Sequence, residues 1–360
     1  RTPMYEYKPD YEDAKKRIDA FWNCEVIDRA LTFINFRRPQ DEQMPTPAKP
    51  EDPKRRKLDV EYRVQAAEAR AYNEVFYADS MPVIQPSLGP ATVASYFGIG
   101  MGFDEATSWA THDIKEWPED LSTILNFDPE GFYYQKSIEI TKALREAGKG
   151  KFITGVQEWL SPADILSAAR GPEQFCMDVI DCPERIAALS ERLSRALLPI
   201  YESFYQMARD AGDPASTWLP LVSEDRYMVI QNDVSSLLSP SMFDEFLLPY
   251  TQRECEYLDH TMYHLDGLQA LKDLDRLLEI PELDAVQWGP PPQHWDWHEW
   301  IDVYKRIQAA GKGFFLPIPA KDLHELPDSG IRPEGAWLVV EGVTNEEEAA
   351  KALRLIEKWV

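Results

Sequence analysis

Cysteine is scarce in this sequence of 360 residues, which holds only Cys24, Cys176, Cys182 and Cys255 and no C-x-x-C pair. Thiols so few and so scattered exclude a disulfide framework. Long apolar runs are also missing, because none approaches the roughly 20 residues that a membrane span needs. We therefore expect a cytoplasmic protein that makes no membrane contact.

Basic residues are outnumbered. The 38 Lys and Arg residues face 62 Asp and Glu residues, which gives a formal net charge of -24. A field of that sign repels both nucleic acid and anionic lipid. A nucleic-acid partner is therefore excluded. Because 44% of the residues are hydrophobic, the chain can bury a large core, and we expect a small-molecule substrate.

Several nucleotide and hydrolase motifs are absent. The glycine cluster FGIGMGF at 97–103 has the wrong spacing for G-x-G-x-x-G, and the sequence contains neither G-K-[ST] nor G-x-S-x-G. His294 and His298 stand four apart, but Trp295 occupies the place where a zinc-protease motif has Glu. These absences argue against nucleotide binding, serine hydrolysis and a metal site at the two histidines.

We expect residues 1–75 to form an N-terminal helical extension. Apolar residues that recur at helical spacing predict an amphipathic helix over residues 11–37. Five prolines in residues 39–57 block both helix and sheet ladders, so this stretch is predicted to be a solvated surface loop. Good helix formers without a breaker predict a second helix over residues 58–77.

Beyond the extension, short apolar runs alternate with stretches of helical pattern. The runs are continuous in apolar character, which is typical of parallel strands covered by helices. The strand candidates are residues 82–86, 152–156, 218–222, 227–231, 262–266, 285–289, 314–318 and 337–342. Eight strand and helix units that close on themselves form a TIM barrel. We therefore predict an α/β fold, a (β/α)8 barrel over residues 76–360 that carries the N-terminal helical extension.

His264 and Asp266 stand out because, in such a barrel, the reacting groups lie at the carboxyl ends of the strands. The two residues end one candidate strand in MYHLDG, and residues two apart on a strand share a face. An imidazole beside a carboxylate suits Zn or another divalent ion. The plainer alternative is that Asp266 caps the next helix and His264 is a hydrogen-bonded core residue.

Glu341, Asp79 and Asp233 are further acidic candidates. Glu341 ends the apolar run of WLVVEG, where a carboxylate is costly unless it is paired or coordinated, and an ordinary ion pair is the alternative. Asp79 and Asp233 begin loops beside other candidate strands, where an acidic residue serves either as a cap or as a site residue.

Two tryptophans near strand ends are candidate substrate contacts. Trp159 and Trp288 would suit a flat apolar or cationic ligand, although the core is the more ordinary place for each. Loops that follow different strands of a barrel converge on one axis. We therefore predict that Trp159, Trp288 and Asp79 surround the same cavity as His264.

Three phrases resemble the uroporphyrinogen decarboxylase superfamily: FYADSMPVIQPSLGPATVASYFGIG, GVQEWLSPADILSAARGPEQF, and NDVSSLLSPSMFDEFLLPYTQRECEYLD followed by YHLDG. Their order and spacing agree with the superfamily, and the resemblance implies a TIM barrel. Asp79 falls at the position of the central Asp of the true decarboxylases. Their R-Q-A-G-R-Y phrase, which grips substrate carboxylates, has no match in this sequence.

The corrinoid-dependent methyltransferases of that superfamily bind Zn through H-x-C and a later Cys. The matching positions are His264, Asp266 and, 341 minus 266 or 75 residues further on, Glu341. The resemblance thus implies a metal site of these three residues, with Zn or another divalent metal, and a corrinoid supplied by a partner protein. Carboxylates in place of thiolates make a harder, more Lewis-acidic site, which suits a metal that polarises an oxygen or nitrogen.

The sequence therefore favours a metal-dependent methyltransferase that passes a methyl group from a small O- or N-methyl compound to a corrinoid protein. In this interpretation Asp79 is catalytic, and Trp159, Trp288 and Asp233 contact the substrate. One alternative is a cofactor-independent decarboxylase of a carboxylated ring substrate, in which Asp79 stabilises a protonated intermediate. A non-catalytic small-molecule-binding barrel is the other. The oligomeric state stays open, with a homodimer among the options.

Overall fold

The computed structural model describes residues 4–359 and has a mixed α/β fold with a mostly parallel central sheet. Seven strands follow the order β2-β1-β11-β10-β9-β8-β7, in which β2 runs antiparallel to β1. The parallel pair β3 and β6 and the antiparallel pair β4 and β5 form two smaller sheets. The strands are β1 (Leu31–Arg37), β2 (Glu74–Ala78), β3 (Val83–Ile84), β4 (Met101–Phe103), β5 (Ser108–Ala110), β6 (Ile153–Thr154), β7 (Tyr227–Gln231), β8 (His260–Asp266), β9 (Ala285–Gly289), β10 (Gly313–Pro319) and β11 (Ala336–Glu341).

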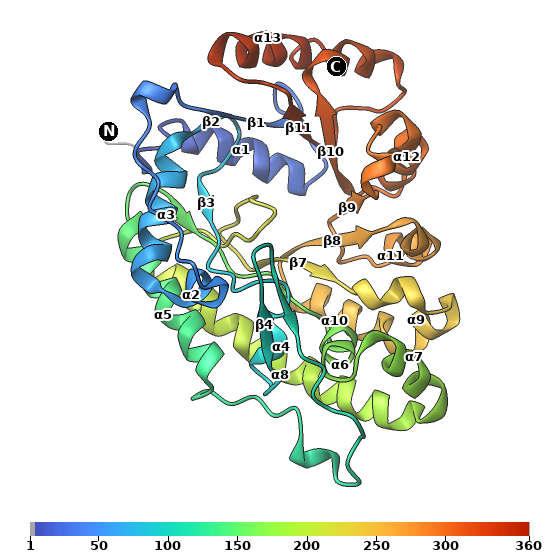
Figure 1. The fold of residues 1–360 in the computed structure, drawn as a ribbon. Coiled ribbons are helices and arrows are strands. Elements are labelled where there is room, and N and C mark those ends of the chain that lie inside the picture. The colour runs from blue at the N-terminus through green and yellow to red at the C-terminus, as the bar shows by residue number, and fades with distance from the viewer. Residues whose placement is uncertain (1–3, 360) are drawn as a thin grey trace.

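Helical segments connect the parallel strands and lie outside them (Figure 1). Each connection from β7 to β11 contains such a segment, as a crossover between parallel strands requires. The helices are α1 (Tyr11–Trp22), α2 (Pro53–Leu58), α3 (Val60–Asn73), α4 (Thr92–Ser95), α5 (Phe132–Gly148), α6 (Pro162–Arg170), α7 (Pro172–Asp181), α8 (Pro183–Ala211), α9 (Pro240–Phe246), α10 (Leu248–Tyr257), α11 (Leu274–Leu278), α12 (Ile301–Ala309) and α13 (Glu346–Ile356). Short 3-10 segments are η1 (Gln40–Glu42), η2 (Leu121–Thr123), η3 (Asp233–Leu237), η4 (Leu268–Asp273), η5 (Pro292–His294), η6 (Trp297–Trp300) and η7 (Ala320–Asp328).

The stretch predicted as one helix over residues 11–37 is a helix followed by a strand. Helix α1 ends at Trp22, and the later LTFINFR forms β1, which lies between β2 and β11. Likewise, the helix predicted over residues 58–77 ends at Asn73 and the chain continues as β2. Both predicted helices are too long, because β-branched and aromatic residues that favour a pleated strand follow the helix, directly after α3 and after residues 23–30 in the case of α1.

The strand predicted over residues 218–222 is not present as a regular strand in the described chain. Pro220 has no N–H for a sheet ladder, and the N–H of Leu221 turns back to the carbonyl of Leu219 at 2.8 Å. The apolar side chains of this segment are buried in the interior core, which explains the apolar run. The other strand candidates coincide with β3, β6, β7, β8, β9, β10 and β11.

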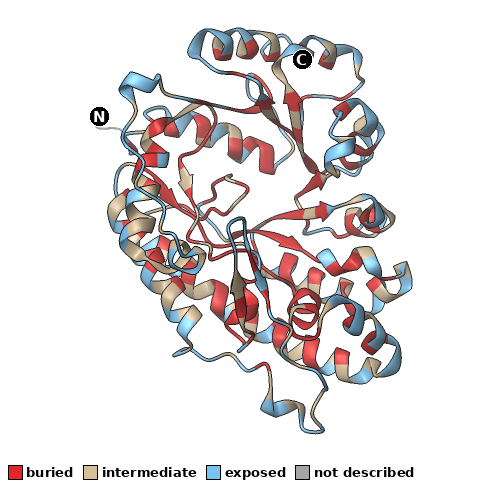
Figure 2. Ribbon diagram, viewed as in Figure 1, coloured by how far each residue is buried: buried red, intermediate tan, exposed pale blue. Residues whose placement is uncertain are grey.

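Side chains of the parallel strands alternate between two core clusters. Met228 and Ile230 belong to the outer cluster, which includes the buried faces of the helices, whereas Val229 belongs to the inner cluster. Burial concentrates on the strands and on the helix faces turned toward them (Figure 2). In the inner cluster Trp22 of α1 stacks on His260, the first residue of β8, with ring centroids 4.7 Å apart. Helix α1 therefore covers the amino-terminal ends of the strands.

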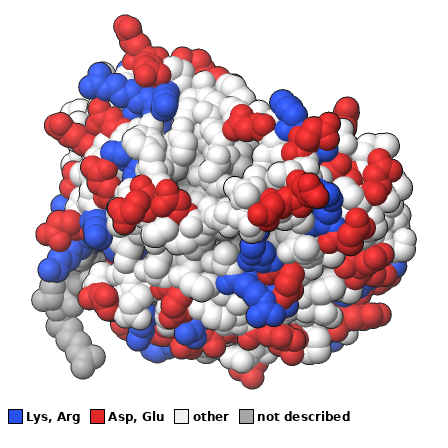
Figure 3. All heavy atoms as spheres, turned by 90° about the horizontal axis from the view of Figure 1, so that it is seen from below, with Lys and Arg blue, Asp and Glu red and all other residues white. Residues whose placement is uncertain are grey.

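Acidic and basic side chains are interspersed over the surface. Figure 3 shows one face with many acidic groups, basic groups among them and no continuous basic patch. All four cysteines carry free thiols. Within residues 4–359, no helix combines the length and the apolar character that crossing a bilayer demands.

Candidate functional site

Two carboxylates and one imidazole meet at the carboxyl ends of β7 and β8. His264 and Asp266 are two of the last three residues of β8. Asp233 is the first residue of η3 and comes two residues after the end of β7. One ligand atom of each residue lies within 4.8 Å of the others. Because β7 and β8 are paired, with Gln231 opposite His264, the two strand ends bring these side chains together. We name Asp233, His264 and Asp266 the strand-end triad.

Neighbouring residues fix the imidazole of the triad. The Nδ1 atom of His264 is hydrogen-bonded to the side-chain oxygen of Gln287 on β9. An amide oxygen only accepts, so Nδ1 carries the proton and Nε2 keeps its lone pair. The ring of Trp218 stands perpendicular to the imidazole, with centroids 5.1 Å apart. Gly289 leaves room for the triad, since a Cβ there would lie 3.2 Å from Oδ1 of Asp266.

Carboxyl groups crowd the triad. Burial raises the pKa of Asp233, the Asp266 carboxylate raises it further, and His264 offsets part of the rise. Burial and the charge of Asp233 raise the pKa of Glu158. Gln231 donates hydrogen bonds to Asp233 at 3.1 Å and to Glu158 at 3.4 Å. Asp233 and Asp266 both keep solvent-exposed surface, and no lysine or arginine of the described chain forms an ion pair with either carboxylate. The triad is therefore accessible to a cation.

A pocket of about 420 Å³ opens beside the triad and shares Asp233 with it. The carboxylate of Asp164 accepts the backbone N–H groups of Asp233 at 2.9 Å and Val234 at 3.0 Å, which fixes the start of η3. Trp109 and Leu237 line the pocket, and both are more exposed than large apolar residues usually are. The pocket therefore offers an apolar surface next to the triad.

Glu341, which the sequence predicts as a metal ligand, is not a member of the triad. It is the exposed last residue of β11 and lies opposite Pro319 of β10. The sheet order places β10 and β9 between β11 and the strand that carries His264. In the group that the structure assembles, Asp233 stands in the position expected for Glu341.

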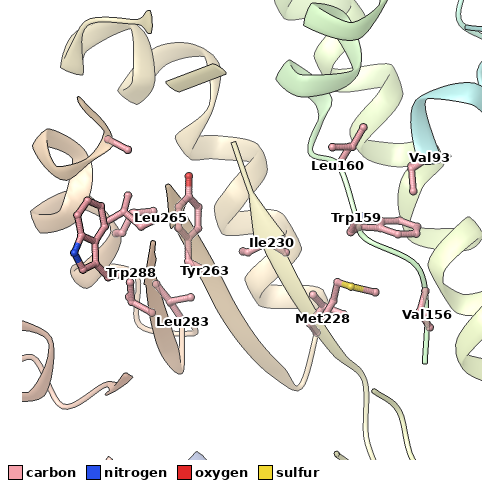
Figure 4. Packing of buried hydrophobic residues seen from close by; sticks show 14 of the residues in the cluster. Val93, Val156, Trp159, Leu160, Met228, Ile230, Tyr263, Leu265, Leu283 and Trp288 are labelled. Carbon is pink, nitrogen blue, oxygen red and sulfur yellow. The ribbon is translucent and has the colours of Figure 1, made fainter. Parts of the chain in front are cut away.

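Trp159 and Trp288 lie on the helix-facing side of the strands, not at the opening predicted for them. Both belong to the outer core cluster (Figure 4). The ring of Trp288 contacts Trp300 at a centroid distance of 5.0 Å, and the ring of Trp159 contacts Tyr201 of α8 at 5.9 Å. The predicted substrate contacts are therefore corrected: these tryptophans are core residues.

Asp79 lies at the other end of the strands. Its fully buried carboxylate accepts the N–H of Thr32, the second residue of β1, at 3.0 Å. Arg29 donates to it at 2.5 and 2.9 Å, and Arg17 donates at 3.2 Å. Amino and carboxyl ends of parallel strands lie on opposite edges of a sheet. Asp79 therefore lies at the opposite edge of the sheet from the triad. The prediction that it faces the cavity of His264 is wrong, and its carboxylate forms a structural ion pair with Arg29.

Glu158 and Gln287 are site residues that the sequence pattern did not reveal. Each directly precedes a tryptophan that the pattern favoured instead, Trp159 or Trp288. Gln287 and Trp288 are successive residues of β9 and point to opposite faces, so a shift of one residue selects the core instead of the site. The detectable signal was a polar residue inside an apolar run, as Gln287 is in AVQWG.

The chain is thus an α/β protein with helix-covered, mostly parallel strands and a polar site at their carboxyl ends. No family model matches the sequence, and no curated protein matches it. Among solved structures it is similar to a methyltransferase from Methanosarcina mazei, with a TM-score of 0.60, over 96% of this chain and 98% of that chain. At 13% identity, this similarity shows that the two chains share a fold.

Proposed function

We propose that the protein is a metal-dependent methyltransferase that takes a methyl group from a small O- or N-methyl compound. The observation that carries the proposal is the convergence of Asp233, His264 and Asp266 at the strand ends. The methyltransferase-like fold supports the same reaction class. The proposed methyl acceptor is a corrinoid carried by a partner protein.

The proposed architecture is a closed TIM barrel. After β2 the chain stays hydrogen-bonded to β1, where the N–H of Asp79 donates to Thr32, and then enters β3. Beyond β6, the N–H of Val156 donates to Ser216. The segment that contains Ser216 leads toward β7, where the hydroxyl of Tyr227 donates to Leu219. These contacts support a ring in which β3 and β6 fill the gap between the two edge strands, β2 and β7.

The triad fits a divalent cation. The hydrogen bond to Gln287 leaves Nε2 of His264 available, and the two carboxylates add oxygen ligands. One imidazole with two carboxylates is a donor set that Zn and other borderline or hard divalent ions accept. In this proposal Asp233, His264 and Asp266 are the ligands, and Glu341 is not.

The metal, when bound, would act as a Lewis acid that weakens the bond between the donor heteroatom and its methyl group. The chain's own residues prepare the place for this. Gln287 sets the tautomer and orientation of His264, and Gln231 links Glu158 to Asp233. The apolar pocket beside Asp233 receives the body of the methyl donor and limits the access of water.

The decarboxylase alternative gave Asp79 the central role, and the burial of Asp79 against Arg29 at the far end of the strands gives it no support. The binding-protein alternative remains an outcome of the experiment below.

The experiment compares metal content and methyl transfer in the wild type, His264→Ala and Asp233→Asn. His298→Ala is the matched control, because His298 is a surface histidine held by Asp296 and Glu325. We expect about one ion per chain in the wild type and the control, and loss of metal and of methyl transfer in the triad variants. Unchanged metal content in the triad variants would reject these ligands. Metal binding without transfer from any aryl methyl ether or methylated amine to a reduced corrinoid would favour the binding protein.

A further inference from the structure

The glycine cluster FGIGMGF at 97–103, whose spacing does not suit nucleotide binding, positions a side chain of the pocket beside the strand-end triad. Gly102 of β4 lies opposite Trp109 of β5 in an antiparallel pair. The indole packs directly on the glycine: a Cβ at position 102 would stand 2.3 Å from Cε2 and 2.7 Å from Nε1 of Trp109. No side chain fits there unless the ring moves. Gly102 therefore sets the position of Trp109.

Trp109 lines the pocket of about 420 Å³ that also contains Asp233, and the residue stays 46% exposed. Leu237 of η3, which is 58% exposed, lines the same pocket. A single exposed apolar side chain needs no explanation, but two that border one hollow mark a candidate binding surface. The indole therefore offers an aromatic surface to a ligand in this pocket.

The polar side chains of the wall give a charged ligand little to bind. The hydroxyl of Ser108 and Nδ1 of His112 are each hydrogen-bonded to a backbone carbonyl, at 2.9 and 2.7 Å. Both carboxylate oxygens of Asp164 accept backbone N–H groups. Within residues 4–359, no lysine or arginine lines the pocket, and most of the remaining wall is aliphatic side chain or proline. The wall therefore suits a neutral, apolar body.

Asp233 also lines the pocket, and in the proposed function it is a ligand of the metal. A divalent ion at this carboxylate offsets its charge and repels a methylated ammonium. A quaternary nitrogen also has no lone pair to offer a Lewis acid, whereas an ether oxygen does. The metal and the apolar wall together favour an ether as the methyl donor.

We propose that the pocket binds the ring of an aryl methyl ether, which stacks on Trp109, so that the methoxy group is directed to the triad. This inference rests on the proposed function and names its substrate class. The C–O bond breaks, its electron pair stays on the ring oxygen of a phenolate product, and the reduced corrinoid supplies the electron pair of the new bond to the methyl group. Trp109 is then a specificity-determining residue, and Gly102 is a positioning residue.

Calorimetric titration of chelator-treated protein measures ring binding without any contribution from a metal. The probes are anisole and methoxycyclohexane, which has the same methoxy group and ring size but no aromatic face. We expect anisole to bind about fivefold more tightly, the ratio typical of one aromatic contact. Trp109→Leu should bind both probes equally, and Trp109→Phe should restore the preference. Gly102→Ala, whose methyl group displaces the indole, should lose the preference as Trp109→Leu does.

Trp295→Leu is the matched control, because Trp295 is 70% exposed and does not line the pocket. It should keep the preference. Equal binding of the two probes to the wild type, or an unchanged preference in Trp109→Leu, would overturn the aromatic site. The metal content of the His264 variants would still test the proposed function independently.

The methyl-transfer assay separates the substrate class from the reaction. Anisole should donate its methyl group, and tetramethylammonium should not. Transfer from tetramethylammonium alone would overturn the aryl ether and retain the proposed function. Conversely, a preference for anisole that depends on Trp109, in a protein that transfers no methyl group, would retain the ring site and reject the reaction.

Discussion

Replacing Asp79 with asparagine should destabilise the fold and leave the triad intact. The carboxylate is fully buried and accepts from Arg29, Arg17 and the N–H of Thr32. Asparagine presents an NH₂ group where these donors need an acceptor, and Arg29, only 5% exposed, then keeps an uncompensated charge. Breaking a buried pair in this way costs about 3–5 kcal/mol of unfolding free energy.

Urea unfolding measures this loss, and metal analysis of the same samples reports on the triad. Asp28→Asn is the control: Asp28 also binds Arg17, but its side chain is 53% exposed, so its loss should cost less than about 1 kcal/mol. In Asp79→Asn/Arg29→Met, where both charges are gone, the cost should be smaller than the sum of the single variants. An Asp79→Asn protein that unfolds at wild-type urea concentrations but loses metal or methyl transfer would refute this reasoning and restore Asp79 to the site.

Three further results are expected. Glu254 is fully buried, and burial raises its pKa from 4.5 to about 8, so the folded state keeps a proton that the unfolded state releases. Stability should therefore fall by about 1.4 kcal/mol per pH unit as the pH rises from 4.5 to 8, and Glu254→Gln should remove that slope in thermal unfolding; parallel profiles would contradict it. Gly289→Ala places a methyl group 3.2 Å from Oδ1 of Asp266 and should weaken metal binding by about tenfold in competition titrations. A general defect of the fold would lower the stability of the protein as well as its metal affinity. Trp288→Ala should lower the unfolding free energy by about 3–5 kcal/mol and keep the metal, whereas Gln287→Ala should lose metal affinity and keep most of the stability. Loss of metal in the Trp288 variant alone would show that Trp288 belongs to the site.

The sequence by itself determined the fold class and the position of most strands. Continuous apolar runs such as YMVIQ and AVQWG, alternating with helical stretches, are typical of parallel strands with helices over them, and these runs are β7 and β9. It also determined that His264 and Asp266 share a face at a strand end, because the period of two along a strand is a local property.

Only the tertiary structure decided which residues join that pair. Asp233 reaches His264 because β7 and β8 are paired in a register that sets Gln231 opposite His264. These paired residues are 33 positions apart in the sequence, and no local pattern encodes a register over that separation. Glu341 and Asp79 were equally plausible from local sequence.

The end of the sheet to which a residue belongs was likewise a tertiary property. Asp79 follows β2, which runs antiparallel to β1, so the chain has already returned to the amino-terminal edge when it reaches this residue. The register between neighbours also decides which side chains of a strand face the interior, and for this reason Trp288 of β9 packs against helices while Gln287 faces the site. Local sequence sets the period of a strand, but only its pairing with neighbours sets the phase and the direction.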